Sequence, residues 1–83
     1  MKITFKLYAS LAKYLPREAH RNQIAVDVEQ GATVADIIAR FNVPEKSAHL
    51  VLVNGVFVPP DARLSQTLTA GDTLAIWPPV AGG

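Results

Sequence analysis

The strongest constraint on the fold is an alternation of apolar and polar residues that opens the chain and returns after a short interval. Residues 2–8 place Ile3, Phe5 and Leu7 on one side, with lysine or threonine between them, and residues 24–29 repeat the period. An alternation of two residues is typical of a half-buried strand. We therefore expect these two segments to be strands that pair with each other.

Residues 33–41 carry the clearest helical pattern of the chain. Thr33 and Asp36 form a capping-box-like pair at its start. The apolar residues that share one face of this helix are Val34, Ile37, Ile38 and Phe41. Their spacing predicts a helix that packs its apolar face against a sheet. A shorter helical segment is expected at residues 10–14, before Pro16.

The second half of the chain predicts a hairpin and a last strand. The Asn-Gly pair at residues 54–55 separates two β-branched runs, and both residues of such a turn take positive φ. Two prolines at residues 59–60 cannot donate to a ladder, so the second arm should be short or at an edge. Residues 73–77 are apolar on both faces, with Trp77 opposite Leu74 and Ile76, which suits the middle of a sheet.

The order of these segments indicates an α+β fold. A mixed sheet of about five strands packs on one main helix, and the two layers enclose one core. With 83 residues, the chain is long enough for a single domain, which we place at residues 1–77, followed by an extended tail at residues 78–83.

The composition excludes several functional classes. The absence of cysteine excludes disulfides, thiolate metal sites and a cysteine nucleophile, and His20 and His49 lie in unlike contexts, so no metal site is expected. The net charge of +1, with scattered basic residues, argues against nucleic-acid binding. No apolar run approaches the roughly 20 residues of a membrane span, and no signal-peptide core is evident, so we expect a cytoplasmic protein without a membrane segment. No nucleophile and base set or phosphate loop indicates a catalytic site of its own.

The segment Pro-Pro-Val-Ala-Gly-Gly at residues 78–83 is the candidate functional feature. Proline fixes φ near −65°, so the segment should project from the domain, with a reach of roughly 20 Å at about 3.3 Å per residue. The α-carboxylate of Gly83 is a group that an ATP-using enzyme can adenylate, and sulfide can then convert it to a thiocarboxylate. The plainer alternative is a flexible glycine-containing terminus without function. The rigid Pro-Pro pair directly after a central strand favours the carrier.

These residues resemble a known family. Val53-Asn54-Gly55, the stretch 68–76 with its Gly71-Asp72 turn, and the ending at 78–83 are similar to the ubiquitin-like sulfur-carrier family (MoaD/ThiS), and most of all to the small subunit of molybdopterin synthase (MoaD). The similarity covers essentially the whole chain and implies the ubiquitin-like β-grasp fold.

The resemblance also implies a reaction cycle and two partners. A ubiquitin-activating-type adenylyltransferase (MoeB-like) uses ATP to adenylate Gly83, and sulfur transfer makes its thiocarboxylate. The large subunit of molybdopterin synthase (MoaE-like) then receives the tail, and the sulfur goes to cyclic pyranopterin monophosphate in molybdenum-cofactor biosynthesis. No cofactor is expected to be bound by the carrier itself. Gly82 gives a slender approach to the reacting carboxylate, and the residues that guide the tail are Pro78, Pro79, Val80 and Ala81.

Trp77, directly before the tail, is the candidate centre of a partner interface, and Phe57 and Tyr8 are expected to extend it. Ordinary core packing, or exposure as lone aromatics, is the alternative for each of them. The alternatives for the whole chain are a carrier that serves thiazole, cysteine or another sulfur product, a modifier that conjugates to lysines, and a non-covalent β-grasp adaptor whose tail is never activated.

Overall fold

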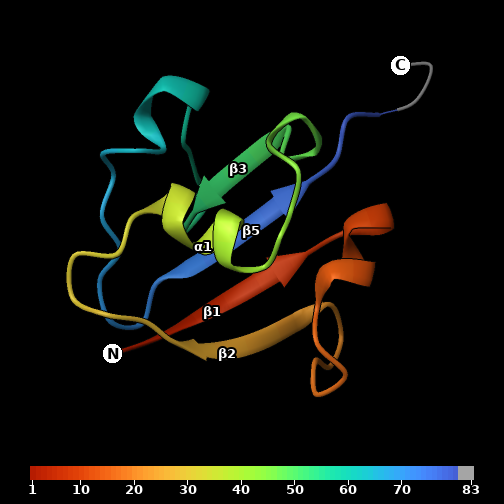
Figure 1. Ribbon diagram of the computed structural model, residues 1–83, viewed down its shortest axis with the longest axis horizontal. Coiled ribbons are helices and arrows are strands. Elements are labelled where there is room, and N and C mark those ends of the chain that lie inside the picture. The colour runs from red at the N-terminus through yellow and green to blue at the C-terminus, as the bar shows by residue number, and fades with distance from the viewer. Residues whose placement is uncertain (81–83) are drawn as a thin grey trace.

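The computed structural model describes residues 1–80, and they form a two-layer α+β domain (Figure 1). Five strands make one mixed sheet in the order β2-β1-β5-β3-β4. Their bounds are Lys2–Leu7 for β1, Gln23–Asp27 for β2, Leu50–Val53 for β3, Val56–Phe57 for β4 and Thr73–Trp77 for β5. The helix α1 is Val34–Arg40, and three 3-10 turns, η1 at Ala9–Tyr14, η2 at Glu45–Ser47 and η3 at Pro60–Ala62, lie in the connections. This arrangement confirms the expected β-grasp fold.

The sheet contains the two pairings that the sequence predicted, β1 with β2 and β3 with β4. β1 runs antiparallel to β2 and parallel to β5, which is antiparallel to β3 on its other side. β5 therefore occupies the centre of the sheet, as expected from its apolar character on both faces. Asn54 and Gly55 take φ values of 51° and 83° in the hairpin turn, and β4 is a two-residue edge strand, because the prolines that follow it cannot donate to a ladder.

Helix α1 begins with the predicted capping box. The backbone N–H of Asp36 donates to the Thr33 hydroxyl over 3.1 Å, and the backbone N–H of Thr33 donates to the Asp36 carboxylate over 2.9 Å. The helix ends at Arg40, and Asn42 follows in the left-handed region with φ 61°. Phe41 is half-buried, and its ring lies 4.7 Å from that of Phe5.

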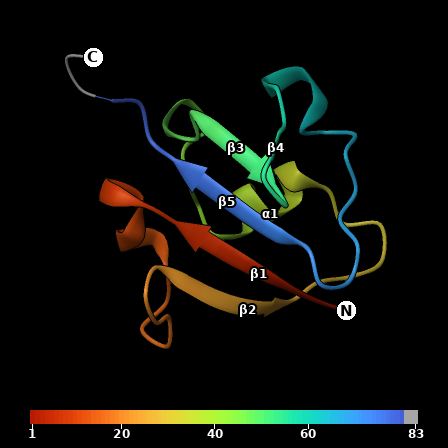
Figure 2. The same ribbon diagram turned by 180° about the vertical axis from the view of Figure 1, so that it is seen from behind.

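The core lies between α1 and one face of the sheet. The helix contributes Val34, Ile37 and Ile38, and the strands contribute Ile3, Phe5, Leu7, Val26, Val51, Val53, Leu74 and Ile76. The view from behind shows the strands in front of α1 (Figure 2), so the other face of the sheet is left without a helix over it. We call this second surface the open face.

Several boundaries differ from the sequence prediction. The helical segment expected at residues 10–14 is a 3-10 turn that begins at Ala9, where φ is 52°. The strand expected at 2–8 ends at Leu7, and the strand expected at 24–29 is Gln23–Asp27. Turns η2 and η3 were not predicted. No helix within residues 1–80 is long and apolar enough to cross a membrane.

Candidate functional site

The root of the tail is held from both sides at the end of β5. The backbone N–H of Tyr8 donates to the Ile76 carbonyl over 3.1 Å, and the backbone N–H of His49 donates to the Trp77 carbonyl over 3.1 Å. Pro78 and Pro79 have no N–H to continue the ladder. The chain therefore leaves the sheet at a fixed point, at the end of the domain opposite the N-terminus (Figure 1).

An aromatic pair reinforces this root. The rings of Tyr8 and Trp77 stack with centroids 4.3 Å apart and planes 4° from parallel, and both residues are half-buried. Such a pair contributes about 0.5–1.5 kcal/mol beyond its buried area. Leu74 and Ile76 are fully buried on the opposite face of β5, as the alternation predicted. Ala9, next to Tyr8, takes a positive φ, which is energetically unfavourable for a residue other than glycine. This conformation turns the chain into η1.

A mostly apolar groove of about 450 Å³ lies beside the tail root. The tail residues Pro78, Pro79 and Val80 form part of its wall, and the rest comes from Ala9, Ser10, His49, Leu50 and Trp77. Val80 is 78% exposed. The tail therefore starts as an accessible apolar segment along a shallow groove.

The open face carries an apolar patch that continues from the tail root. The strand register places Trp77 opposite Leu50, and Ala75 opposite Leu52, which in turn pairs with Phe57. We call the set Tyr8, Leu50, Leu52, Phe57, Ala75 and Trp77 the open-face patch. Leu50 is 37% exposed and Phe57 is 51% exposed.

The three aromatic residues predicted as a partner interface thus share one face, although their role in binding stays a prediction. Leu50 and Leu52 were not singled out from the sequence. The signal was present, because residues 50–53 alternate between the two faces, and Val51 and Val53 on the inner face are buried.

A hydrogen-bonded network joins the Asn-Gly and Gly-Asp turns. The Asn54 amide donates to the Asp72 carboxylate over 2.8 Å, and its oxygen accepts from the Thr73 N–H over 2.9 Å. Asp72 also accepts from the Thr69 N–H over 2.8 Å and from the Thr69 hydroxyl over 3.1 Å. The Thr69 backbone N–H, helped by the Asn54 and Thr69 side chains, lowers the pKa of Asp72 against the opposing effect of burial. The network fixes the start of β5, and therefore the register of the strand that leads to the tail.

Arg63 is a buried cation that the sequence analysis did not single out. It is 6% exposed, and its guanidinium donates to the carbonyls of Ala48 (2.7 Å), His49 (3.3 Å) and Val58 (3.4 Å). Burial lowers its pKa, and the nearby Glu45 opposes this shift. Because His49 holds the Trp77 carbonyl, Arg63 supports the tail root through one intermediate residue. A single arginine in an irregular segment gave no pattern from which to predict this.

Three of the predicted site residues come at the end of the tail. Gly83, Gly82 and Ala81 lie outside the described residues. Within residues 1–80, no three histidine, aspartate or glutamate side chains gather as ligands for a metal ion. His20 and His49 are both exposed.

One known protein family matches nearly the whole chain. The chain matches the Mut7-C ubiquitin family (Ub-Mut7C) over residues 1–82. A search of curated proteins found no match.

Solved structures give three informative neighbours. SAMP1 of Haloferax volcanii, a small archaeal modifier protein, is 30% identical, with 100% of both chains covered and a TM-score of 0.69. The Pyrococcus furiosus protein named as molybdopterin converting factor subunit 1 is 23% identical, with 95% of this chain and 98% of that chain covered and a TM-score of 0.64. A complex of subunits 1 and 2 of molybdopterin-converting factor from Helicobacter pylori contains a chain that is 16% identical, with full coverage of both and a TM-score of 0.62.

The last two neighbours are too distant in sequence to show more than the shared fold. The family match spans nearly the whole chain, and the SAMP1 match spans all of it. The chain therefore belongs to the Mut7-C ubiquitin family, and its ubiquitin-like β-grasp fold is the fold that the resemblance in its sequence predicted.

Proposed function

We propose that the chain is a sulfur carrier whose reactive group is the α-carboxylate of Gly83, and that it serves as the small subunit of a molybdopterin synthase. The observation that carries this proposal is the construction of the tail root. Backbone hydrogen bonds from Tyr8 and His49 hold the end of β5, and two prolines then direct the chain outward from the sheet.

The chemistry needs no side chain of the carrier. A carboxylate oxygen of Gly83 attacks the α-phosphorus of ATP in the activating enzyme, pyrophosphate leaves, and an acyl-adenylate forms. Sulfide then attacks the activated carbonyl carbon, AMP leaves, and the thiocarboxylate remains. Since the chain has no cysteine, any sulfur it carries sits on the backbone carboxyl group. Because adenylation depends on ATP, we propose that the cycle runs in the cytoplasm.

The domain supplies recognition and positioning. Docking of a partner on the open-face patch brings the tail root to the edge of the interface, because Trp77 belongs to both. The tail then enters the partner's site as a narrow extended chain with Gly82 before the reacting residue. We expect the activating enzyme and the large synthase subunit to use this same face in turn, so that only one can hold the carrier at a time.

A reconstitution tests the synthase role. The full chain is charged by the activating enzyme, ATP and a sulfur donor, and then mixed with the large subunit of the same organism and cyclic pyranopterin monophosphate. Formation of molybdopterin, and its loss on deletion of Gly82 and Gly83, supports the proposal. A charged carrier that yields no molybdopterin contradicts the synthase role but leaves sulfur carriage for another product, such as thiazole or cysteine.

A second function is favoured by one comparison. SAMP1, a modifier protein, is 30% identical over the full length of both chains, which makes conjugation of Gly83 to lysine side chains the leading alternative. An isopeptide-linked product of higher mass, formed with the activating enzyme and ATP in cell extract, would identify it. A non-covalent adaptor would instead keep its partner function without residues 82–83.

A further inference from the structure

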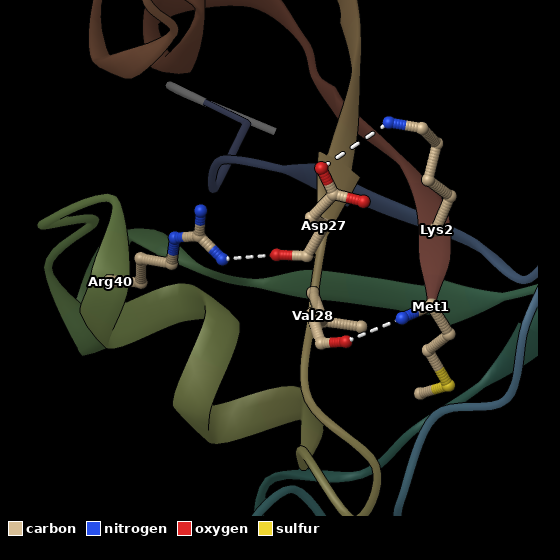
Figure 3. Close-up of polar contacts among 5 residues, drawn as sticks. All are labelled: Met1, Lys2, Asp27, Val28 and Arg40. Atoms are coloured by element: carbon tan, nitrogen blue, oxygen red, sulfur yellow. Dashed lines mark hydrogen bonds and ion pairs between the residues drawn. The ribbon is translucent and has the colours of Figure 1, made fainter.

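The strands of the open face carry one unbalanced positive charge. The charged side chains on its strands are Lys2 and Lys6 on β1 and Asp27 on β2. Lys2 pairs with the Asp27 carboxylate (Figure 3), with its Nζ 3.3 Å from the nearer oxygen. Arg40 from α1 donates instead to the backbone carbonyl of Asp27 over 2.7 Å. Lys6 makes no ion pair or side-chain hydrogen bond with any residue from 1 to 80. The net charge that these strands present on the open face therefore lies at Lys6.

The register places Lys6 at the border of the open-face patch. Lys6 pairs with Ala75, which pairs with Leu52, which pairs with Phe57, so the four residues form one row across the sheet. Ala75 is only 7% exposed, between the longer side chains of Lys6 and Leu52. Lys6 itself is half-buried, whereas Lys2 is exposed. The aliphatic stem of Lys6 therefore extends the apolar surface, and its ammonium group marks the edge of that surface.

We propose that the partner that docks on the open-face patch presents a carboxylate side chain beside its own apolar surface, and that this carboxylate pairs with Lys6. The inference rests on the proposed function, since it names the partner chemistry for the same face. An apolar partner without such a group would remove water from the Lys6 ammonium without supplying a polar partner for it, and this would weaken binding. A partner with a carboxylate at this point gains an ion pair and a faster encounter. Lys6 thus selects among partners that are equally apolar.

Lys2 provides the matched control. It lies on the same strand and the same face, four residues away, but it already has Asp27 as its partner. The pair is exposed on both sides, and such pairs contribute little to stability. A Lys2→Glu variant therefore changes the overall charge of the chain as Lys6→Glu does, without changing the group at the patch border.

The experiment measures binding of the full chain to the large subunit of molybdopterin synthase by surface plasmon resonance, at low and high salt. We expect Lys6→Glu to weaken binding about tenfold or more, with most of the change in the association rate, and Lys2→Glu to change it less than about twofold. Lys6→Met keeps the stem and removes the charge. It should weaken binding severalfold at low salt and reduce the salt dependence.

Tighter or unchanged binding by Lys6→Met at low salt, or equal effects of the two glutamate variants, would overturn the inference. Lys6→Gln is measured alongside, so that misfolding of one variant does not decide the outcome. Thiocarboxylate formation by the wild-type chain is followed in the same preparations. If the wild type is charged and binds normally but the Lys6 variants bind equally well, only the role of Lys6 is refuted. If the wild type neither becomes charged nor binds, the proposed function and this inference are refuted together.

Discussion

Substitution of Asp72 by alanine tests how the start of β5 is held. The carboxylate accepts three hydrogen bonds, from the Asn54 amide (2.8 Å), the Thr69 N–H (2.8 Å) and the Thr69 hydroxyl (3.1 Å). Hydrogen bonds to charged groups contribute about 1.5–3 kcal/mol each. Asn54 and Thr69 are exposed, so water can accept hydrogen bonds from their donors once the Asp72 carboxylate is removed. We therefore expect Asp72→Ala to lower the free energy of unfolding by about 2–4 kcal/mol, less than the full sum.

The same network predicts a pH dependence. The pKa of Asp72 is lower in the folded chain than in the unfolded chain. The ionised Asp72 therefore stabilises the fold at any pH above the unfolded pKa of about 3.9, and this stabilisation is lost as the pH falls through the folded pKa. The difference in unfolding free energy between the wild type and Asp72→Asn should therefore be constant near neutral pH. It should shrink from about pH 4 downward.

Urea denaturation followed by circular dichroism, from pH 7 to acid, measures both effects. Asp61 is an exposed carboxylate without a side-chain hydrogen bond within residues 1–80, so Asp61→Asn should stay within about 0.5 kcal/mol of the wild type. Asn54→Ala combined with Asp72→Ala should cost less than the sum of the two single variants. A loss below about 1 kcal/mol for Asp72→Ala would contradict the role assigned to the Asp72 network. So would a difference between the wild type and Asp72→Asn that does not change with pH.

Two further predictions concern the tail root. Arg63→Met removes three hydrogen-bond donors from buried or partly buried carbonyls and should lower the free energy of unfolding, measured in urea, by about 2–4 kcal/mol. The control Arg40→Met, at an exposed arginine, should lower it by less than about 1 kcal/mol, and equal losses would contradict the role assigned to Arg63. Trp77→Ala removes the ring stacked on Tyr8 and should weaken partner binding by about 2 kcal/mol or more in a calorimetric titration. Leu64 is 80% exposed and lies outside the open-face patch, so Leu64→Ala should leave the affinity unchanged, and retained affinity in Trp77→Ala would exclude the patch as the interface.

The sequence predicted the elements that depend on local patterns. Strand alternation located β1, β2 and β5, and the two-faced apolar character of β5 gave its central position. The capping pair Thr33 and Asp36 marked the start of α1 within one residue. The turn at residues 54–55 was predictable because the Asn-Gly pair accepts the positive φ of a two-residue hairpin.

The remaining features depend on contacts between distant segments. Arg63 lies in an irregular stretch, and nothing local predicts that its guanidinium reaches carbonyls on two other segments. The Asp72 network needed the relative placement of two turns that are far apart in the chain. No sequence pattern distinguishes Lys6 from the other lysines of the chain. The strand register sets Lys6 beside Ala75, and Lys2 is paired with Asp27.

Intact mass spectrometry of the chain after incubation with the activating enzyme, ATP and a sulfur donor tests whether Gly83 carries sulfur. We expect a mass change of one oxygen-for-sulfur exchange, placed on Gly83 by fragmentation. The exchange should be absent without ATP and after deletion of Gly82 and Gly83, with the circular dichroism spectrum of the deletion variant unchanged. An intact chain that is neither adenylated nor sulfurated under these conditions would contradict the claim that Gly83 carries sulfur.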